Sequence, residues 1–233
     1  MTAATAGSRV PNSEIVRAKI DLFGRRLALS AYTFWDSPDF PRLYREHIFQ
    51  SYSIVRASVP LMQAAQRACG DPQYAGEAAL QGFAQYLQRH VPEETGHHRW
   101  VLDDGEAMGI ERGAILARLP TESVAQLVGV QYYWIHHYNP IALAGYIATL
   151  EGNPPSVDWI EQVAARHRLP LQCFSSLLHH ARLDLHHRQD LDDVLDSLPL
   201  SEDHLTLIGL SSLHTIRLLT EIMEGIAGPG QYS

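Results

Sequence analysis

The sequence has few cysteines, a shortage of basic residues and no long apolar run, and each shortage excludes a class of protein. Only two of the 233 residues are cysteine, with no CxxC pair, which suits a reducing cytosol and argues against an iron–sulfur cluster or a structural zinc site. The net charge of -8 argues against nucleic-acid and membrane-surface partners. The longest apolar run, residues 141–150, is too short to span a bilayer, and no signal peptide is visible. We therefore expect a cytoplasmic protein.

No segment shows the polar–apolar alternation of a strand, so the sequence predicts an all-α protein. Residues 1–13 are expected to form a disordered tail and residues 14–233 a single domain of eight or so helices. Candidate N-caps are Ser13, Thr121, Ser156 and Ser201. The predicted helices cover roughly residues 14–32, 41–69 (with a kink at Pro60), 74–90, 92–108 (a new helix or a bent continuation of the preceding one), 121–138, 141–151, 156–168, 170–198 and 201–225.

Histidine is abundant, with 13 residues, and the helix predicted over residues 170–198 holds two adjacent pairs. One face of this helix is apolar at both ends and carries His180, Asp184 and His187 in its middle. A buried carboxylate is costly unless it is paired or bound to a metal ion. The pattern therefore indicates metal ligands, and a metal-free His–Asp–His hydrogen-bond network is the alternative.

Two further segments place acidic or histidine side chains on faces that should be buried. Glu94 and His97 lie three residues apart on an otherwise apolar stripe, although His98 is an alternative to His97. Glu93 is interpreted as an ordinary first-turn acid that the helix dipole favours. Glu151 ends a short predicted helix, where the dipole repels an acid, and this broken local rule points to function. An ordinary exposed C-terminal glutamate is the alternative for Glu151.

These three segments together supply carboxylates and imidazoles that suit two iron or manganese ions, since a bridging carboxylate can hold both. The pattern is not that of ferritin-like proteins, which need Glu-x2-His on two helices. The candidate metal ligands are Glu94, His97, Glu151, His180, Asp184 and His187.

Neighbouring residues carry two weaker expectations. Asp104 lies on the Glu94 stripe and is expected to accept a hydrogen bond from a ligating imidazole, with a seventh metal ligand as the alternative. Tyr133, Trp134 and His137 belong to an aromatic segment close in sequence to Glu151 and are candidates for lining the substrate pocket. Aromatic stripes nevertheless form ordinary core more often than pockets.

The three segments, in this order, resemble the haem-oxygenase-like di-iron oxidases and oxygenases, also called iron-containing redox enzymes. The resemblance rests on EETGHHRWVLDDGEAMG, GYIATLEG and HARLDLHH and covers about residues 42–198. It implies a haem-oxygenase-like bundle of seven to eight helices in which the six candidate ligands hold two iron ions. It also implies a diferrous site that reacts with O2 and oxidises a small amine, amino acid or fatty acid, by N-oxygenation or oxidative C–C cleavage.

No dinucleotide-binding motif or cysteine cluster is present, so an external reductant is expected. The expected partners are then O2 and a small-molecule substrate, and a homodimer is left open. One alternative is a metal-independent enzyme of the same fold, similar to thiaminase II or to pyrroloquinoline-quinone synthase. Haem oxygenase itself is disfavoured. It needs a proximal histidine early in the chain, and the first candidate in this sequence is His47. A non-enzymatic interaction protein is the remaining alternative, but it gives no reason for a buried Asp184.

Overall fold

The computed structural model describes residues 10–152 and 154–228, apart from the side chains of residues 184 and 185, and this part of the chain is helical without a strand. The all-α prediction is confirmed. The α-helices are α1 (Asn12–Phe23), α2 (Arg25–Trp35), α3 (Phe40–Cys69), α4 (Ala78–Glu94), α5 (His98–Ala107), α6 (Arg112–Ala117), α7 (Glu122–His137), α8 (Leu143–Leu150), α9 (Val157–His167), α10 (Ser175–Ser197) and α11 (Glu202–Ala227). Short 3-10 turns η1 (Pro72–Tyr74), η2 (Pro140–Ala142) and η3 (Leu171–Phe174) connect them.

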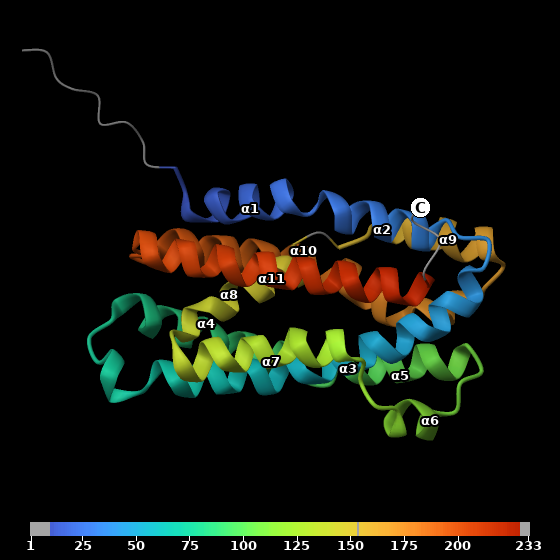
Figure 1. Ribbon diagram of the computed structural model, residues 1–233, viewed down its shortest axis with the longest axis horizontal. Coiled ribbons are helices and arrows are strands. Elements are labelled where there is room, and N and C mark those ends of the chain that lie inside the picture. The colour runs from blue at the N-terminus through green and yellow to red at the C-terminus, as the bar shows by residue number, and fades with distance from the viewer. Residues whose placement is uncertain (1–9, 153, 229–233) are drawn as a thin grey trace, which may run out of the picture.

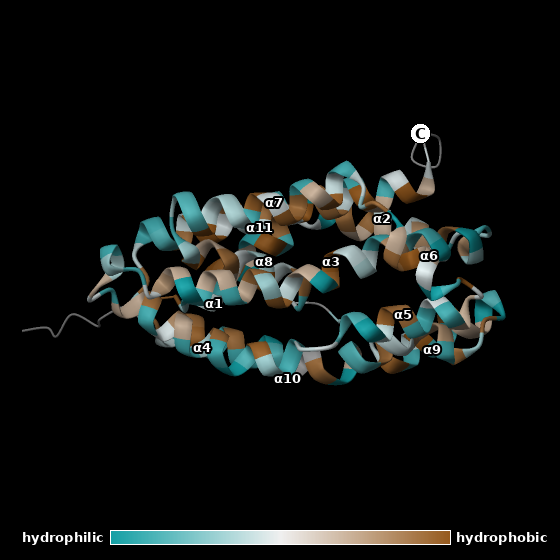
Figure 2. Cartoon of the chain, turned by 90° about the horizontal axis from the view of Figure 1, so that it is seen from below, coloured by the Kyte–Doolittle hydropathy of each residue, from teal (hydrophilic) through white to brown (hydrophobic). Residues whose placement is uncertain are grey.

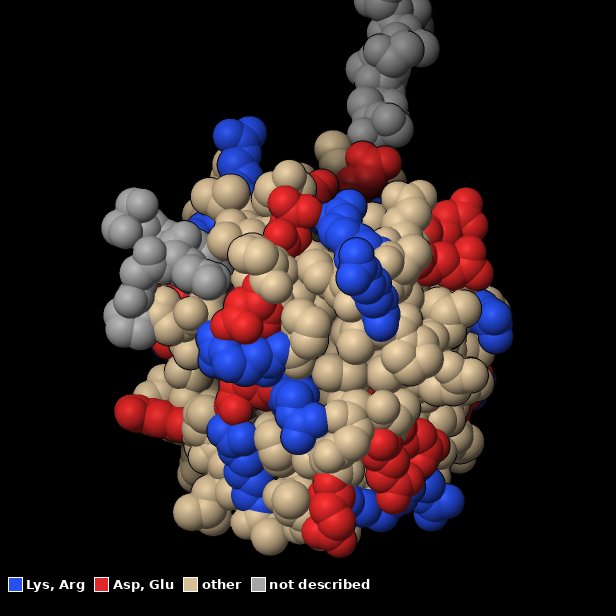
Figure 3. Space-filling model, turned by 90° about the vertical axis from the view of Figure 1, so that its right-hand side faces the viewer, with Lys and Arg blue, Asp and Glu red and all other residues tan. Residues whose placement is uncertain are grey.

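The helices form an elongated bundle whose long members run side by side (Figure 1). Helix α11 packs against α1 and α2 on one side and against α7 and α8 on the other, while α3 packs against α4, α5 and α7. Apolar residues gather on the faces where helices meet, and polar residues face outward (Figure 2). At one end of the bundle, acidic and basic side chains are interspersed on the surface (Figure 3).

Helix α8 lies in the centre of the bundle, and its residues from Leu143 to Ala148 are all buried. Gly145 allows this position, because a Cβ atom there would lie 2.1 Å from the carbonyl oxygen of Ile208 in α11. The absence of a side chain at Gly145 thus lets α8 pack closely against α11. The C-terminal end of α8, which carries Glu151, is therefore held deep in the protein.

Several predicted helix boundaries are confirmed, and three are wrong. Thr121, Ser156 and Ser201 each accept a hydrogen bond from the first turn of α7, α9 and α11, as N-caps do. Ser13 does not cap α1, which begins at Asn12. The backbone N–H and the hydroxyl of Ser13 instead donate to Asp196 at 2.8 and 2.9 Å. The helix predicted over residues 14–32 is divided at Gly24 into α1 and α2.

Of the two alternatives left open at Pro92, the continuation of the preceding helix is correct. Helix α4 continues through Pro92 to Glu94, and the chain turns at Gly96, whose φ of +102° is a conformation that glycine adopts readily. The helix predicted from Pro170 begins with η3, and its α-helical part starts only at Ser175. Helix α6 was not predicted. In the described part of the chain, no helix is both long enough and apolar enough to cross a membrane.

Candidate metal centre

The ends of α4 and α8, the turn before α5 and the middle of α10 bring acidic and histidine side chains together inside the bundle. Glu94 is the last residue of α4, His97 precedes α5, and Glu151 follows α8. His180 and His187 lie on α10, two turns apart. All of these side chains are buried except that of His180, which is half-buried. Segments far apart in sequence thus converge on one point.

Glu94 lies at the centre of this cluster. Its Oε2 atom is 3.1 Å from Nδ1 of His97, and its Oε1 atom is 3.5 Å from Nδ1 of His187. The rings of His97 and His180 meet edge to face, with 5.1 Å between their centroids. The two oxygens of one carboxylate therefore face imidazoles from two different parts of the chain.

Asp184 is the predicted ligand about which the structure says least. Its backbone lies within α10, between His180 and His187, but its side chain is outside the described part of the structure. Its role as a ligand stays a prediction. The five other predicted ligands all lie in the cluster.

His90 belongs to the same cluster and was not among the predicted ligands. It is only 2% exposed, and its Nε2 atom lies 3.2 Å from Oε1 of Glu151. Its ring meets the ring of His187 edge to face at 4.8 Å. The signal was present in the sequence, because His90 precedes Glu94 by four residues on the same helical stripe. Three-residue and four-residue spacings along one helix should have extended the set to His90.

Glu93 also reaches the cluster, against the expectation that it is an ordinary first-turn acid. Its side chain is 43% exposed, yet its Oε2 atom lies 3.4 Å from His90 and 3.6 Å from His187. Glu93 ends a helix instead of starting one, so the dipole argument applied to it was wrong. In each of two overlapping groups, three donor atoms lie within 4.8 Å of one another. The first group comes from His90, Glu93 and His187. The second comes from His90, Glu94 and Glu151.

The charges in the cluster shift one another's proton affinities. Burial by itself would lower the pKa of His90, but its hydrogen bond to Glu151 and the nearby carboxylates raise that pKa to about 9. Burial would raise the pKa of Glu94, but His97 and the other imidazoles lower it overall. The histidines and carboxylates therefore stabilise one another as opposite charges, as buried charges require.

Two arginines hold the end of α8 where Glu151 projects. Arg17 donates to the carbonyl of Ala148 at 2.7 Å, and Arg188 donates to the carbonyl of Gly152 at 2.9 Å. Arg17 is also paired with Asp192 of α10 at 2.8 Å. These cations at the C-terminus of α8 offset the dipole that disfavours an acid there. The unfavourable position of Glu151 is thus compensated by residues distant in sequence.

Asp104 does not have the partners that the sequence analysis expected. It is buried, and it accepts hydrogen bonds from the backbone N–H groups of Ser175 at 2.6 Å and Ser176 at 3.2 Å. These are among the first N–H groups of α10, which no intrahelical carbonyl can satisfy. Burial raises the pKa of Asp104 to about 7, although these hydrogen bonds oppose the shift. Asp104 thus fixes the start of the helix that carries His180 and His187.

The ring of Trp100 in α5 lies between His97, which precedes the same helix, and His179 of α10. Its ring stacks on that of His97 at 4.0 Å and on that of His179 at 4.3 Å. His179 is half-buried against Trp100. This stack limits the rotation of His97 and ties α5 to α10.

The aromatic residues of α7 lie elsewhere. Tyr133 is 57% exposed, His137 is exposed, and the ring of Trp134 stacks on His214 of α11. These positions do not fit the expectation that the three residues line a substrate pocket. Their segment is close to Glu151 in sequence, but α7 packs on α3 and α11, away from α4 and α10.

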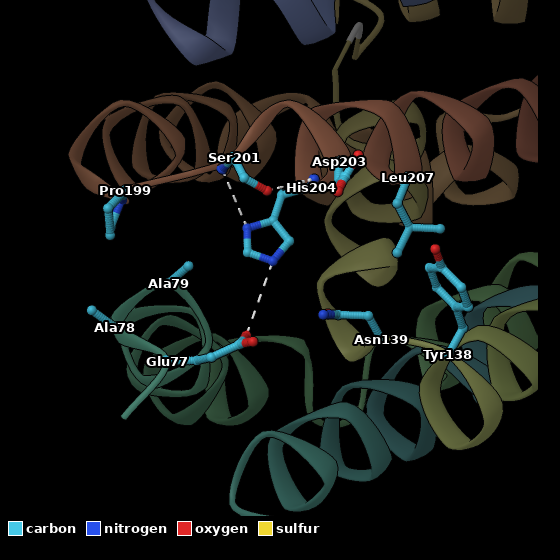
Figure 4. A pocket seen from close by; sticks show the side chains of 10 residues that line it. All are labelled: Glu77, Ala78, Ala79, Tyr138, Asn139, Pro199, Ser201, Asp203, His204 and Leu207. Carbon is cyan, nitrogen blue, oxygen red and sulfur yellow. Dashed lines mark hydrogen bonds and ion pairs between the residues drawn. The ribbon is translucent and has the colours of Figure 1, made fainter. Parts of the chain in front are cut away.

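A surface pocket of about 530 Å³ lies at the opposite end of α4 (Figure 4). Glu77, which precedes α4, faces His204 across this pocket at 4.0 Å. Helix α4 is 17 residues long, so the pocket is roughly 25 Å from Glu94. The pocket is therefore separate from the metal-ligand cluster and cannot deliver a substrate to it.

The chain is thus an all-helical bundle whose interior gathers carboxylates and imidazoles from several segments. The sequence model of the iron-containing redox enzymes matches residues 46–218, and the chain belongs to that family. The resemblance stated from the sequence is thereby confirmed. No curated protein is significantly similar to it in sequence.

Solved structures share the fold over nearly the whole chain. A domain of unknown function with a haem-oxygenase-like fold from Shewanella denitrificans superimposes with a TM-score of 0.77, at 16% identity, over 94% of this chain and 93% of that one. A TenA homologue from Pseudomonas syringae pathovar tomato gives 0.73, at 11% identity, over 97% of both chains. A CADD-like protein of unknown function from Nostoc punctiforme gives 0.63, at 13% identity, over 93% and 96%. The chain has the haem-oxygenase-like fold.

Proposed function

We propose that this protein is a non-haem di-iron enzyme that uses O2 to oxidise a small molecule. The observation that carries the proposal is the buried cluster of carboxylates and imidazoles around Glu94. Membership of the iron-containing redox enzyme family supports it. The proposed iron ligands are Glu94, His97, Glu151, His180, Asp184 and His187, and His90 is a further donor in the same cluster.

The residues present fit iron by their chemistry and their burial. Imidazole and carboxylate are the ligands that suit iron and manganese, and no cysteine lies in either group of three donors. Glu94 faces His97 with one oxygen and His187 with the other, so its carboxylate is the one placed to serve two ions. The two groups of donors share His90 and so lie in one cluster, which supports a metal centre at this place.

Ferrous iron, when bound, would supply the electrons that reduce O2. The chain's own residues have other tasks. The bundle around Glu94 and His187 keeps bulk water from the ligands, since both side chains are buried. Arg17 and Arg188 keep Glu151 in place, and Trp100 keeps His97 in place. A rigid ligand set of this kind is what a metal centre needs to leave selected positions open.

The substrate class and the reductant follow from the resemblance stated above. We propose a small amine, amino acid or fatty acid as the substrate, changed by N-oxygenation or by oxidative C–C cleavage. The reductant would be external. The cluster lies inside the bundle and the 530 Å³ pocket lies far from it, which favours a small substrate.

A metal-independent enzyme of the same fold is the alternative. One observation favours it, because the imidazoles and carboxylates already pair with one another, as the 3.2 Å contact between His90 and Glu151 shows. Such a network could be structural. It would, however, leave the buried carboxylates of Glu94 and Glu151 in one small cluster with no metal ion to offset their charge, which is costly.

Iron binding under anaerobic conditions separates the two functions. Purified protein is loaded with ferrous ion and freed of excess metal, and its iron content is measured. We expect about two iron ions per chain. Wild-type protein that retains no iron would overturn the di-iron proposal and favour the metal-independent alternative.

A matched pair of variants tests the ligand assignment. His187→Ala should lose iron, because His187 is buried and faces Glu94. His186→Ala should keep iron, because the neighbouring His186 is exposed. Equal iron losses in both variants would show that the assignment rests on the wrong helical face.

Asp184→Ala tests the ligand whose side chain is not described. We expect it to abolish iron-dependent O2 consumption and to leave the helix content unchanged, as measured by circular dichroism. Normal iron content combined with a lowered melting temperature would instead assign Asp184 a structural role.

A further inference from the structure

Tyr86 lies beside the cluster and has no part in the ligand set. It is on α4, one turn before His90, and its ring stacks on the His90 ring with 5.1 Å between centroids and 19° between planes. Tyr86 is only 1% exposed, which makes it one of the largest fully buried side chains of the protein. Its ring therefore forms part of the wall of the site.

The hydroxyl of Tyr86 is buried and has no hydrogen-bond partner among the described residues. Tyr44, which is equally buried, shows the ordinary arrangement, because its hydroxyl donates to the carbonyl of Cys173 at 2.9 Å. A buried hydroxyl without a partner loses its hydration and gains nothing in return. Such a group needs an explanation, and Tyr86 lies next to the residues proposed to bind iron.

The surroundings of Tyr86 determine the protonation state of its hydroxyl. Burial raises the pKa of Tyr86 well above its ordinary value, and the nearby carboxylates of Glu151 and Glu94 raise it further. The hydroxyl is thus close to the carboxylate side of the cluster, and it keeps its proton. A protonated phenol can donate one hydrogen bond to an acceptor.

We propose that Tyr86 is a further residue of the metal centre, whose hydroxyl donates a hydrogen bond to a small acceptor ligand held at the cluster. The inference rests on the proposed function. The ligand class is a small anion or an oxygen-bearing group of O2 or substrate size, since the stacked ring on His90 brings the phenol close to the donor atoms. Tyr146 also has a buried hydroxyl without a partner among the described residues, but of these two tyrosines it is Tyr86 whose ring stacks on a histidine of the cluster.

Azide is a suitable probe, because it is a small anion that binds to ferric iron and accepts hydrogen bonds. Iron-loaded, air-oxidised wild-type protein and the Tyr86→Phe variant are titrated with sodium azide, and the visible absorption of the azide complex is followed. We expect the same iron content in both proteins and an azide Kd about tenfold higher in Tyr86→Phe, the effect of losing one hydrogen bond to a charged acceptor.

Tyr44→Phe is the matched control. It removes a buried hydroxyl that has a partner, so it should lower the melting temperature and leave azide affinity unchanged. Tyr86→Phe removes a buried hydroxyl without a partner, so its melting temperature without azide should not fall. A fall equal to that of Tyr44→Phe would overturn the inference, because the hydroxyl would then have a structural partner.

The remaining outcomes separate this inference from the proposed function. If wild-type protein binds iron and both proteins bind azide equally well, only the role of Tyr86 is wrong. If Tyr86→Phe holds less iron than wild type, the hydroxyl serves the metal ligands and not a bound acceptor, and the inference is again wrong. If wild-type protein holds no iron, the di-iron proposal fails, and the role of Tyr86 fails with it.

Discussion

His90 and His47 lie in regions of this protein that affect the same side chain in opposite ways. His90 lies among the carboxylates of the metal-ligand cluster, and its pKa is raised to about 9. His47 lies in an aromatic cluster with Phe34, Trp35 and Tyr44, where burial lowers its pKa to about 4. His47 forms a hydrogen bond with the hydroxyl of Ser51.

The opposite pKa shifts of the two histidines follow from their neighbours. Aromatic rings and one hydroxyl cannot compensate a positive charge, so His47 stays neutral and is part of the core. Carboxylates can compensate it, and the same groups can compensate the charge of a metal ion. A buried histidine therefore indicates a binding site only when acidic groups from other helices surround it. The predictions below test this contrast, from the largest expected effect to the smallest.

The largest difference should appear in metal affinity. His90→Gln should weaken binding of ferrous or cobalt ion roughly 10- to 100-fold, because His90 belongs to both groups of converging donors. His47→Gln should leave it unchanged. Calorimetric titration of both variants measures the effect, and an equal loss in the two would abolish the contrast between the regions.

Acid stability should depend on His47. The pKa of His47 is about 4 in the folded protein and about 6.5 in an unfolded chain. The unfolded chain therefore binds a proton first as the pH falls below about 6.5, and the folded protein loses stability until about pH 4. The loss attributable to His47 is about 3 kcal/mol.

Urea unfolding of metal-free protein at pH 7 and pH 4.5 measures that loss. His47→Leu should remove much of the acid sensitivity over this range, because no proton can bind there. A variant with the same pH dependence as wild type would show that His47 does not titrate as its surroundings indicate.

Arg17 should stabilise both α8 and the metal centre. Arg17→Met removes the hydrogen bond to Ala148 and the ion pair with Asp192, and should lower the free energy of unfolding by about 1–3 kcal/mol. Metal affinity should fall slightly, since Glu151 follows directly on α8. Arg26→Met is the control, because the exposed pair of Arg26 with Glu224 should contribute little. Equal effects of the two variants would contradict this role of Arg17.

The smallest effect should come from Asp104. Asp104→Asn keeps an oxygen that can accept from the N–H groups of Ser175 and Ser176, so the free energy of unfolding should change by only about 1 kcal/mol. Metal affinity, measured as for His90, should not change. A large loss of metal binding would restore the alternative that Asp104 is a seventh ligand.

The sequence by itself determined the helical class, many of the helix boundaries and the family. These features depend on local rules, because a capping serine and an apolar stripe act within a few residues of one another. Thr121, Ser156 and Ser201 could be recognised as caps for that reason. The phase of α10 was also readable, and it correctly placed His187 inside and His186 outside.

Only the tertiary structure decided which partner each buried polar group has. Asp104 binds the start of α10, 71 residues later, and Arg17 binds the end of α8, 131 residues later. Helical periodicity shows that a side chain faces inward but not what it meets there, since that depends on the rotation and register of a neighbouring helix. His90 and His47 are both inward-facing histidines in the sequence. The packing of α4 beside α10 made His90 part of a charged cluster, and the packing of α3 beside α2 made His47 part of an aromatic core.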